Sequence, residues 1–445
     1  MLVSSMRISR LSSIVFVPLL GLCHGANAGP EVLDGSTASV LLRNYFLHND
    51  YRHDALRDKN YQQEWAQGFI GRFSSGFTPG ALGVGIDAHG FLGLRLDSGR
   101  GTSGTGLLPL DSDGRAEPQY SSAGLALKLQ AGDTLIKLGE MEVETPVFDT
   151  ADKRLQPEYA TGVLLQNASV PGMTWVAGRF SAFKNQAQSS SHDDFEGYGA
   201  STTGHGISLA GVQTATGAPW GGALYVSRLD DTWHQYYGNL NHTQALSSGT
   251  SLFLDANLYR TLDTGDASAG EIATTASSLL GRLRSGGQTF SLGYQKIHGD
   301  TPFDFVGGDS IYLANSIKYA DFNGANEQSW QLRYDLDLKR ILPGLSLMAR
   351  YVRGSQIDGS KAPAGGAYNP FDEGLQRYVP GQGKGGKHWE RDLALAWTVP
   401  SGPARDLTVN LSHVSHRGNA AQGNNDLDRL YLVVEYPFDL LRVQP

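Results

Sequence analysis

The stretch that decides the fold is residues 330–339, WQLRYDLDLK. Successive side chains of a β-strand point to opposite faces of the sheet, so this segment has two distinct faces. Its Trp, Tyr and Leu residues form one face, and its Gln, Arg, Asp and Lys residues form the other. A strand of this kind has an apolar medium on one side and water on the other.

The same unit, a strand of about ten residues followed by a turn, recurs through the chain. In residues 123–141, Leu125, Leu127 and Leu129 alternate with small or charged residues before a turn at 131–133. This period-two alternation predicts strands rather than helices. Further segments with the pattern are residues 251–260, 279–294, 345–351, 393–399, 407–411 and 430–440.

Two architectures are compatible with such strands. In a soluble β-sandwich or β-helix, the apolar face would pack inward and the charged face would meet water. Here aromatic residues gather at the ends of the apolar rows, and an outward apolar band between aromatic girdles is typical of an outer-membrane barrel with a polar interior. Examples are Trp330, Tyr334, Trp397 and Tyr436. We therefore predict an all-β fold, a transmembrane antiparallel β-barrel in the bacterial outer membrane.

Short turns alternate with longer polar connections, as expected for periplasmic turns and extracellular loops. Without an export segment of 28 residues, described next, 417 of the 445 residues remain (445 − 28). At about 23 residues per strand and connection, they predict roughly 18 strands and a remaining lumen. The long connections are residues 98–120, 142–159, 185–205, 230–243, 263–271, 299–311, 321–328, 354–388 and 418–426.

The first residues read as a signal peptide. Arg7 and Arg10 precede an apolar run at residues 11–23, and Ala26-Asn27-Ala28 offers the small-x-small cleavage pattern. We expect residues 1–28 to be removed and residues 29–445 to form one barrel domain.

The only cysteine, Cys23, lies inside this segment. A lipoprotein signal at Cys23 is disfavoured because the preceding Leu22 is bulky. The mature chain would then lack disulfides and thiolate chemistry. Its formal charge would be 34 − 44 = −10, against −8 for the full chain, and an acidic exported chain gives no support for nucleic-acid binding.

Several segments of the chain, taken in sequence order, resemble a known family. They include residues 42–46, 50–52, 76–78, 83–87, 152–157, 299–304, 308–316, 319–324, 343–345, 390–393 and 435–437. In their order and spacing the chain resembles the OprD family of substrate-specific outer-membrane channels of pseudomonads and relatives. The resemblance covers the whole predicted mature chain.

The resemblance implies an eighteen-stranded barrel with a constriction loop around Glu142–Tyr159 and a second inward loop at Gly299–Tyr312. It also implies a row of basic residues down the lumen and passage of small carboxylate-bearing solutes, such as amino acids and aromatic acids. A physical argument that does not depend on the resemblance also favours a basic row. A carboxylate crossing a low-dielectric pore needs compensating charge, and arginine offers bidentate contacts. Its binding must be weak enough to permit release.

Candidate arginines of the basic row follow from the family match and from strand alternation. Arg154 lies where the family places such an arginine, although a loop salt bridge is the alternative. Alternation with leucines places the strand arginines on the inner face, because a lipid-facing arginine would cost ~2–4 kcal/mol near the midplane. Some of these could simply pair with inner acids such as Asp335. The candidates are Arg154, Arg282, Arg284, Arg333, Arg350 and Arg52, with the face of Arg43 left open.

Acidic and polar loop residues are the second candidate group, which we expect to line an eyelet. Aspartate and serine also make their own turns through local backbone bonds, and that structural role is the alternative for each. The candidates are Asp149, Asp152, Asp300, Asp304, Asp309, Ser310 and Tyr312.

Two departures from the family pattern leave fewer cations in the basic row. Asn410 and Ser412 stand where relatives carry arginines, with His413, His416 and Arg417 nearby, and Lys184 is the only cation close to Gln186. Uncharged or zwitterionic solutes therefore remain an alternative, as for a general diffusion porin.

Other function classes are less well supported. The chain has no Gly-x-Ser-x-Gly elbow in a strand–turn–helix context, no phosphate loop and no HExxH motif, so we predict no enzyme, metal or cofactor. A non-conducting barrel that acts as an adhesin or receptor scaffold, and a membrane-embedded hydrolase, stay open as alternatives. Expected partners are outer-membrane lipid, lipopolysaccharide and small solutes, with no nucleic acid, and the expected state is a monomer or weak trimer.

Overall fold

The computed structural model describes residues 35–52, 60–98, 101–197, 206–215, 218–423 and 426–441. The expected export segment, residues 1–28, lies outside the described residues. Eighteen strands form one sheet. They are β1 (Thr37–Tyr51), β2 (Tyr61–Ser74), β3 (Gly83–Asp97), β4 (Gln119–Ala131), β5 (Thr134–Met141), β8 (Tyr159–Asn167), β9 (Met173–Lys184), β10 (Ile207–Thr214), β11 (Trp220–Leu229), β12 (Trp233–Ser247), β13 (Thr250–Asp263), β14 (Ala273–Ser285), β15 (Gln288–His298), β16 (Gln328–Asp337), β17 (Leu345–Asp358), β20 (Lys384–Thr398), β21 (Thr408–Gly418) and β22 (Leu427–Asp439).

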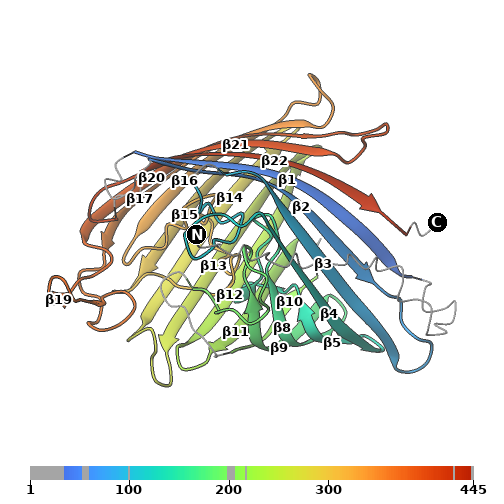
Figure 1. Cartoon of the computed structure of the whole chain (residues 1–445), viewed down its shortest axis with the longest axis horizontal. Helices are drawn as coiled ribbons and strands as arrows, with labels where there is room; N and C mark the ends of the chain where they lie inside the picture. The colour runs from blue at the N-terminus through green and yellow to red at the C-terminus, as the bar shows by residue number, and fades with distance from the viewer. Residues whose placement is uncertain are drawn as a thin grey trace, which may run out of the picture.

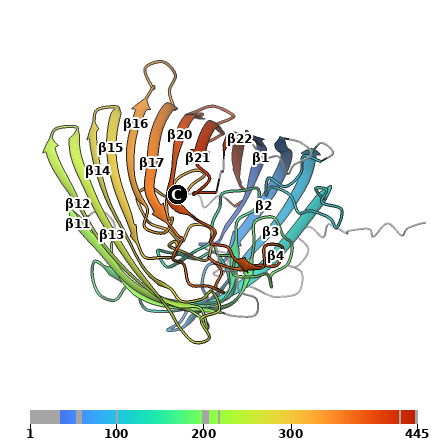
Figure 2. The ribbon, with the colours of Figure 1, turned by 90° about the vertical axis from the view of Figure 1, so that its left-hand side faces the viewer.

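The sheet is a closed barrel. Each strand pairs antiparallel with its neighbours along the chain, and the first strand also pairs with the last, with Arg43 opposite Glu435. Figure 2 shows β1 beside β22 at this closure. Closure leaves no unpaired sheet edge, which is the condition for strands to cross a bilayer. The predicted fold class and the number of strands are both confirmed.

The alternation read from the sequence separates the two faces of the barrel. Leu125, Leu224 and Leu332 are 66%, 65% and 63% exposed, so the leucine rows point outward. Gln331 and Ser278, from the opposite face, are buried at 4% and 3% exposure. An outward apolar surface of this kind is stable only against lipid.

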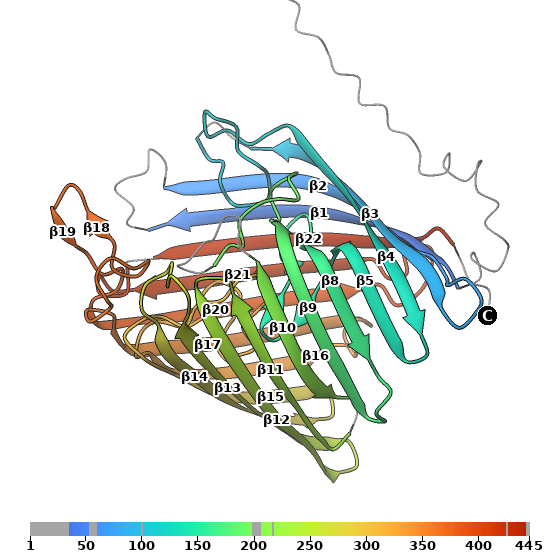
Figure 3. The ribbon, with the colours of Figure 1, turned by 90° about the horizontal axis from the view of Figure 1, so that it is seen from below.

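The two ends of the barrel differ in the length of their connections. At one end, β4 and β5 are joined through Ala131–Thr134 and β14 and β15 through Ser285–Gln288. The pairing of Ser39 with Asp439 places both terminal strand ends there as well. The long connections leave the other end, where the hairpin of β18 (Phe371–Asp372) and β19 (Arg377–Tyr378) projects from the strands (Figure 3). Short turns mark the periplasmic side, so the long loops are extracellular.

Several long connections pack inside the barrel instead of projecting from it, including residues 101–118, where the N–H groups of Gly104 and Leu107 donate to the buried Glu64 of β2; two others bind each other directly. We call residues 142–158 the first inner loop, which contains the hairpin of β6 (Glu144–Thr145) and β7 (Phe148–Asp149), and residues 299–327 the second inner loop. Phe148, Phe303 and Val306 from these loops form one buried cluster with Phe180 and Tyr259 of the strands. In Figure 1 segments drawn in teal and tan lie within the ring of strands. No helix long and apolar enough to cross a membrane occurs in the part of the chain that the structure describes.

Candidate functional site

The two inner loops are joined to each other by side-chain hydrogen bonds. The backbone N–H of Asp149 donates to Ser310 Oγ at 2.6 Å, and the Ser310 hydroxyl donates to the carbonyl of Val306 at 2.5 Å. The phenol of Tyr312 donates to Asp149 Oδ2 at 2.6 Å. The sequence-predicted eyelet residues Asp149, Ser310 and Tyr312 therefore come together, although their lining role stays a prediction.

Glycines and a buried carboxylate make the close approach of the loops possible. Gly307 has φ +82°, and a Cβ there would lie 2.5 Å from the Asp149 carbonyl oxygen. A Cβ at Gly308 would lie 2.7 Å from the Ala151 methyl carbon. Glu158 then accepts hydrogen bonds from the N–H groups of Ala151 at 2.7 Å and Gly308 at 2.8 Å.

Two carboxyl groups at this junction titrate near neutrality. Burial raises the pKa of Asp149 to about 7, against the opposing effect of the Tyr312 hydrogen bond. Burial also raises the pKa of Glu158 to about 7, although its two backbone hydrogen bonds favour the charged form. The charge inside the barrel therefore changes across the neutral pH range.

The first inner loop crosses to β1 and β2. Arg43 is buried, and its guanidinium binds Asp152 Oδ1 at 2.5 Å, Glu435 Oε1 at 2.6 Å and the carbonyl of Arg154 at 2.8 Å. Leu155 packs on β2, where a Cβ at Gly68 would lie 3.2 Å from it. The inner face of β1 thus fixes the backbone on both sides of Arg154. Arg43, whose face the sequence left open, points inward.

Arg154 keeps an uncompensated charge. It is partly exposed, and its Nη1 donates to the carbonyl of Lys153 at 3.1 Å. Among the described residues no carboxylate forms an ion pair with Arg154, whereas the neighbouring Lys153 pairs with Asp309 of the second inner loop. Lys153 and Asp309 remain 46% and 35% exposed, so water reaches both of them inside the barrel.

The second inner loop crosses to β20 and β22. Glu390 accepts hydrogen bonds from the N–H groups of Tyr319 at 3.0 Å and Ala320 at 2.8 Å. Lys318 Nζ lies 5.3 Å from the ring centre of Tyr431, and the Arg429 guanidinium lies 4.7 Å from that of Tyr319. Burial lowers the pKa of Lys318.

Lys318 and Arg429 were not among the sequence candidates. Arg429 follows the same alternation as Arg333. Its neighbours Asp428 and Leu430 face outward, so Arg429 faces inward. That pattern could have identified it. Lys318 lies in an irregular loop, and no periodicity indicates its direction.

The strand arginines nearest the loops face inward, but carboxylates compensate them. Arg333 binds Asp335 through two hydrogen bonds of 2.8 and 2.7 Å. Arg350, opposite Arg333 in the register, binds Asp392 at 2.6 Å. The side chains of Arg350 and Asp392 are only 9% and 0% exposed. Arg333 and Arg350 therefore pair with acidic residues inside the barrel, which is the alternative that the sequence left open for them.

The other basic candidates lie away from the loop junction. Arg282 is on the inner face and lies 5.5 Å from the ring centre of Phe253, while Arg284 is next to the periplasmic turn. Arg52 lies at the extracellular end of β1 and is ion-paired with Asp428, whose side chain is on the outward face of β22. The structure does not bring Arg52 to the lumen, because the alternation of β1 turns it outward with Asp50.

Two acidic candidates are also separate from the junction. Asp304 is buried and bonded to Tyr368, and its carbonyl accepts from Gln235 at 3.2 Å. Asp300 lines a different cavity, of about 250 Å³, that also contains Pro302 and Tyr368. By contrast Asp152, 39% exposed, lies beside Arg43 at the crossing of the first inner loop.

The departures from the family pattern can be placed as well. The Ser412 hydroxyl donates to Asn410 Oδ1 at 2.7 Å on the inner face, so this part of β21 is uncharged. Of the basic residues nearby, His413 and Arg417 lie on its outward face, whereas His416 is buried on the inner face. Lys184 is buried and paired with Glu140, and is therefore not an available cation.

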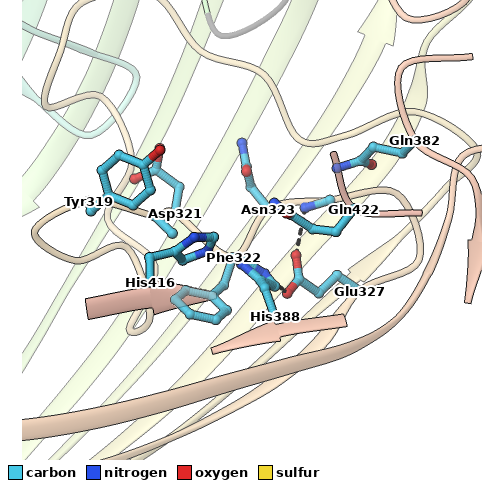
Figure 4. Close-up of a pocket in the computed structure, with 11 residues that line it drawn as sticks. Tyr319, Asp321, Phe322, Asn323, Glu327, Gln382, His388, His416 and Gln422 are labelled. Carbon is cyan, nitrogen blue, oxygen red and sulfur yellow. Dashed lines mark hydrogen bonds and ion pairs between the residues drawn. The ribbon is translucent and has the colours of Figure 1, made fainter. Parts of the chain in front are cut away.

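A polar cluster holds the end of the second inner loop against β20 and β21. His388 Nε2 lies 2.6 Å from Glu327 Oε1, and its Nδ1 lies 2.8 Å from His416 Nε2. Phe322 stacks on His388 with ring centres 4.2 Å apart. These side chains line a cavity of about 180 Å³ (Figure 4). No group of three or more residues able to hold a metal ion occurs within the described ranges.

Comparison with known proteins gives consistent matches over nearly the whole chain. A family model described as outer membrane porin, OprD family, matches residues 30–440. Porin D of Pseudomonas aeruginosa is 40% identical over 419 residues, which cover 92% of each chain. The porin-like protein GalP of Pseudomonas putida is 31% identical and covers 96% of each chain. The crystal structure of Pseudomonas aeruginosa OpdK with vanillate superposes with a TM-score of 0.81 at 35% identity, covering 92% of this chain and 100% of that one.

Proposed function

This chain belongs to the OprD family of outer-membrane porins, and from that premise we propose that its channel selects small water-soluble nutrients that carry a carboxylate. Its relatives are porins, and the eighteen-stranded barrel is an outer-membrane channel. The proposal concerns the solute class and the residues that select it.

The observation that carries the proposal is the uncompensated charge of Arg154. Arg43 and the packing of Leu155 hold its backbone at the crossing of the first inner loop, where Lys153 and Asp309 are exposed to water. A solute carboxylate would be the missing partner of this guanidinium, and the pair would replace hydration lost in a narrow passage. Because Arg154 is partly exposed, the contact would be weak enough to release the solute.

Further cations near Arg154 support a path with several contacts, because Tyr45 donates to the carbonyl of Lys153 at 3.2 Å and its ring centre lies 6.4 Å from that of Tyr431. Lys318 and Arg429 lie beside the rings of Tyr319 and Tyr431. A carboxylate could move from one cation to another while an aromatic or aliphatic body passes the tyrosine rings. The OpdK structure contains vanillate, an aromatic carboxylate, and that compound is therefore a suitable first probe.

Transport of uncharged or zwitterionic solutes is the second candidate, and two observations favour it. Asn410 and Ser412 are neutral, and Arg333 and Arg350 already have carboxylate partners. With fewer free cations, the acidic groups Asp152 and Asp309 would contribute more to selection. A zwitterion could then bind Arg154 and one of these acids together.

The test is solute flux through the reconstituted protein. We expect Arg154→Ala to reduce vanillate flux several-fold and to leave glucose flux unchanged, because only the anion uses the guanidinium. Arg52→Ala is the matched control, since Arg52 lies at the outer rim with Asp428. Equal vanillate flux through Arg154→Ala and wild type would reject the proposed role.

The other function classes considered from the sequence would give different results in separate measurements on the reconstituted protein. A barrel that serves only as an adhesin or receptor scaffold would show no single-channel current when folded. A membrane-embedded hydrolase would turn over esters or peptides, and a serine-directed reagent would abolish the turnover.

A further inference from the structure

The outward face of the barrel carries a group of basic side chains around one tryptophan. We call Arg353, Lys387, Arg391 and Trp389 the basic lipid-facing patch. They lie on β17 and β20, and their strand neighbours Val352 and Asp392 are buried on the inner face at 0% exposure. Arg353, Lys387 and Arg391 are exposed. The alternation thus turns these three cations away from the channel.

The strand register brings the patch together. Arg353 lies directly opposite Trp389, and Tyr351 lies directly opposite Arg391. The rings of Tyr351 and Trp389 are stacked, with centres 6.0 Å apart. Directly opposed residues of antiparallel strands have Cβ atoms about 5 Å apart, so Arg353 lies beside the indole of Trp389 and Arg391 lies beside the ring of Tyr351. The result is a polar-and-aromatic surface on rigid strands rather than on a loop.

Arg391 lies deeper in the membrane than its neighbours. It precedes Trp397, which marks the periplasmic girdle on the same strand, by 397 − 391 = 6 residues, and Leu393 and Leu395 lie between them. Six residues span about 20 Å along a strand, or roughly 15 Å along the normal at the usual tilt, which is less than the ~25 Å apolar band. An arginine at this depth is costly unless a polar lipid group meets it.

The protein itself does not compensate the charges of the patch. No ion pair of Arg353, Lys387 or Arg391 occurs among the described residues, and Arg391 donates only to Ser415 Oγ, at 3.2 Å. The adjacent Arg417 is already paired with Asp428 at 2.9 Å. Three positive charges therefore face lipid on a chain whose net charge is −8.

We propose that the basic lipid-facing patch binds the phosphate groups of lipid A, the phosphorylated glycolipid of the outer leaflet. The patch lies toward the end with the long extracellular loops, so it faces that leaflet. Arginine offers bidentate hydrogen bonds to phosphate oxygens, and Lys387 adds a point charge. Trp389 and Tyr351 contact the acyl chains next to the headgroup, as aromatic side chains do at membrane interfaces. The inference does not depend on the solute that the channel selects.

Lipid A binding to the purified full-length protein in mild detergent tests the inference. Wild type and the triple variant Arg353→Gln/Lys387→Gln/Arg391→Gln are titrated with diphosphoryl lipid A, phosphatase-treated lipid A and inorganic phosphate. Native mass spectrometry counts bound lipid, and the midpoint of thermal unfolding reports stabilisation. We expect diphosphoryl lipid A to bind wild type about tenfold or more tightly than the triple variant, because each basic contact to an anionic surface contributes. Inorganic phosphate alone should not stabilise the protein, since it lacks the acyl chains.

The control is Arg179→Gln, because Arg179 also lies on the lipid-facing side but is ion-paired with Asp230 at 2.5 Å. It should bind lipid A as wild type does. Single-channel conductance should be unchanged in the triple variant, which separates this test from that of the proposed function. If the triple variant does not fold, Arg353→Gln alone provides the comparison. Equal binding by wild type and variant, or equal binding of phosphatase-treated lipid A, would overturn the inference.

Discussion

Tyr312 and Asp149 lie 163 positions apart in sequence, and the 2.6 Å hydrogen bond between them joins the two inner loops inside the barrel. The Tyr312→Phe variant removes this bond and leaves Asp149 with a weaker set of partners. Such a hydrogen bond is worth about 0.5–1.5 kcal/mol when the carboxyl group is neutral and about 1.5–3 kcal/mol when it is charged, so the loop junction should open more often in the variant. We expect larger current fluctuations in single-channel recordings at constant folded yield. The control is Tyr294→Phe, on the barrel's lipid-facing side, and equal noise in both variants would contradict the prediction.

Gly307 tests the close approach of the loops. In Gly307→Ala the methyl group meets the Asp149 carbonyl and the backbone keeps an unfavourable positive φ. We expect faster hydrogen exchange in residues 142–158 and a barrel that remains folded. Gly286→Ala is the matched control, because Gly286 has φ +57° with nothing within 4 Å of the added carbon. The close contact, rather than φ strain, is responsible only if Gly307→Ala has the larger effect.

The loop junction should depend on pH. The pKa values of Asp149 and Glu158 are raised by burial to about 7, above the ordinary 3.8 and 4.5. Because both groups hold their protons more tightly in the docked loops, the docked state is most stable when the pH is below their ordinary pKa values. This stabilisation is lost as the pH rises through 7. We therefore expect less current noise at pH 5 than at pH 8. Glu158→Gln should flatten part of this dependence, and a pH-independent noise level in wild type would contradict the assignment.

The ion pair between Arg350 and Asp392 is predicted to limit anion selectivity. Asp392→Asn would leave Arg350 as an uncompensated cation on the inner face, next to Arg333 in the register. The reversal potential in a salt gradient should shift toward anions. The cost in stability should be large, about 3–5 kcal/mol, because a buried pair is broken. Asp337→Asn, near the periplasmic turn, should leave the reversal potential closer to that of wild type.

The barrel could be predicted from the sequence because strand alternation is a local signal. Leu332 and Arg333 are neighbours, and their opposite faces follow from period two alone. Arg52 shows the limit of this reasoning. It lies at the end of a strand, and the family resemblance did not establish whether its side chain faces the lumen or the outside. The pairing of Arg350 with Asp392, 42 residues apart, needs the register, which no single strand specifies.

The positions of the inner loops could be predicted from the sequence, but their conformations and mutual contacts could not. Loops around residues 142–159 and at residues 299–312 were expected to fold inward, and the structure packs residues 142–158 and 299–327 inside the barrel. Their mutual contacts, such as Glu158 with Gly308, depend on a positive φ and on burial that have no periodic signature. Asp300 and Asp304 look equivalent to Asp309 in the sequence, yet only Asp309 pairs with Lys153 of the first inner loop.

The closure of the barrel has a consequence for engineering. Ser39 and Asp439 lie opposite each other at the periplasmic end, so a short linker could join the two ends of the chain as another tight turn. New termini could then be opened within the extracellular loop at residues 358–384, which includes the projecting β18–β19 hairpin. A circularly permuted pore of this kind would keep every strand neighbour and would present a fusion partner or affinity tag at the cell surface.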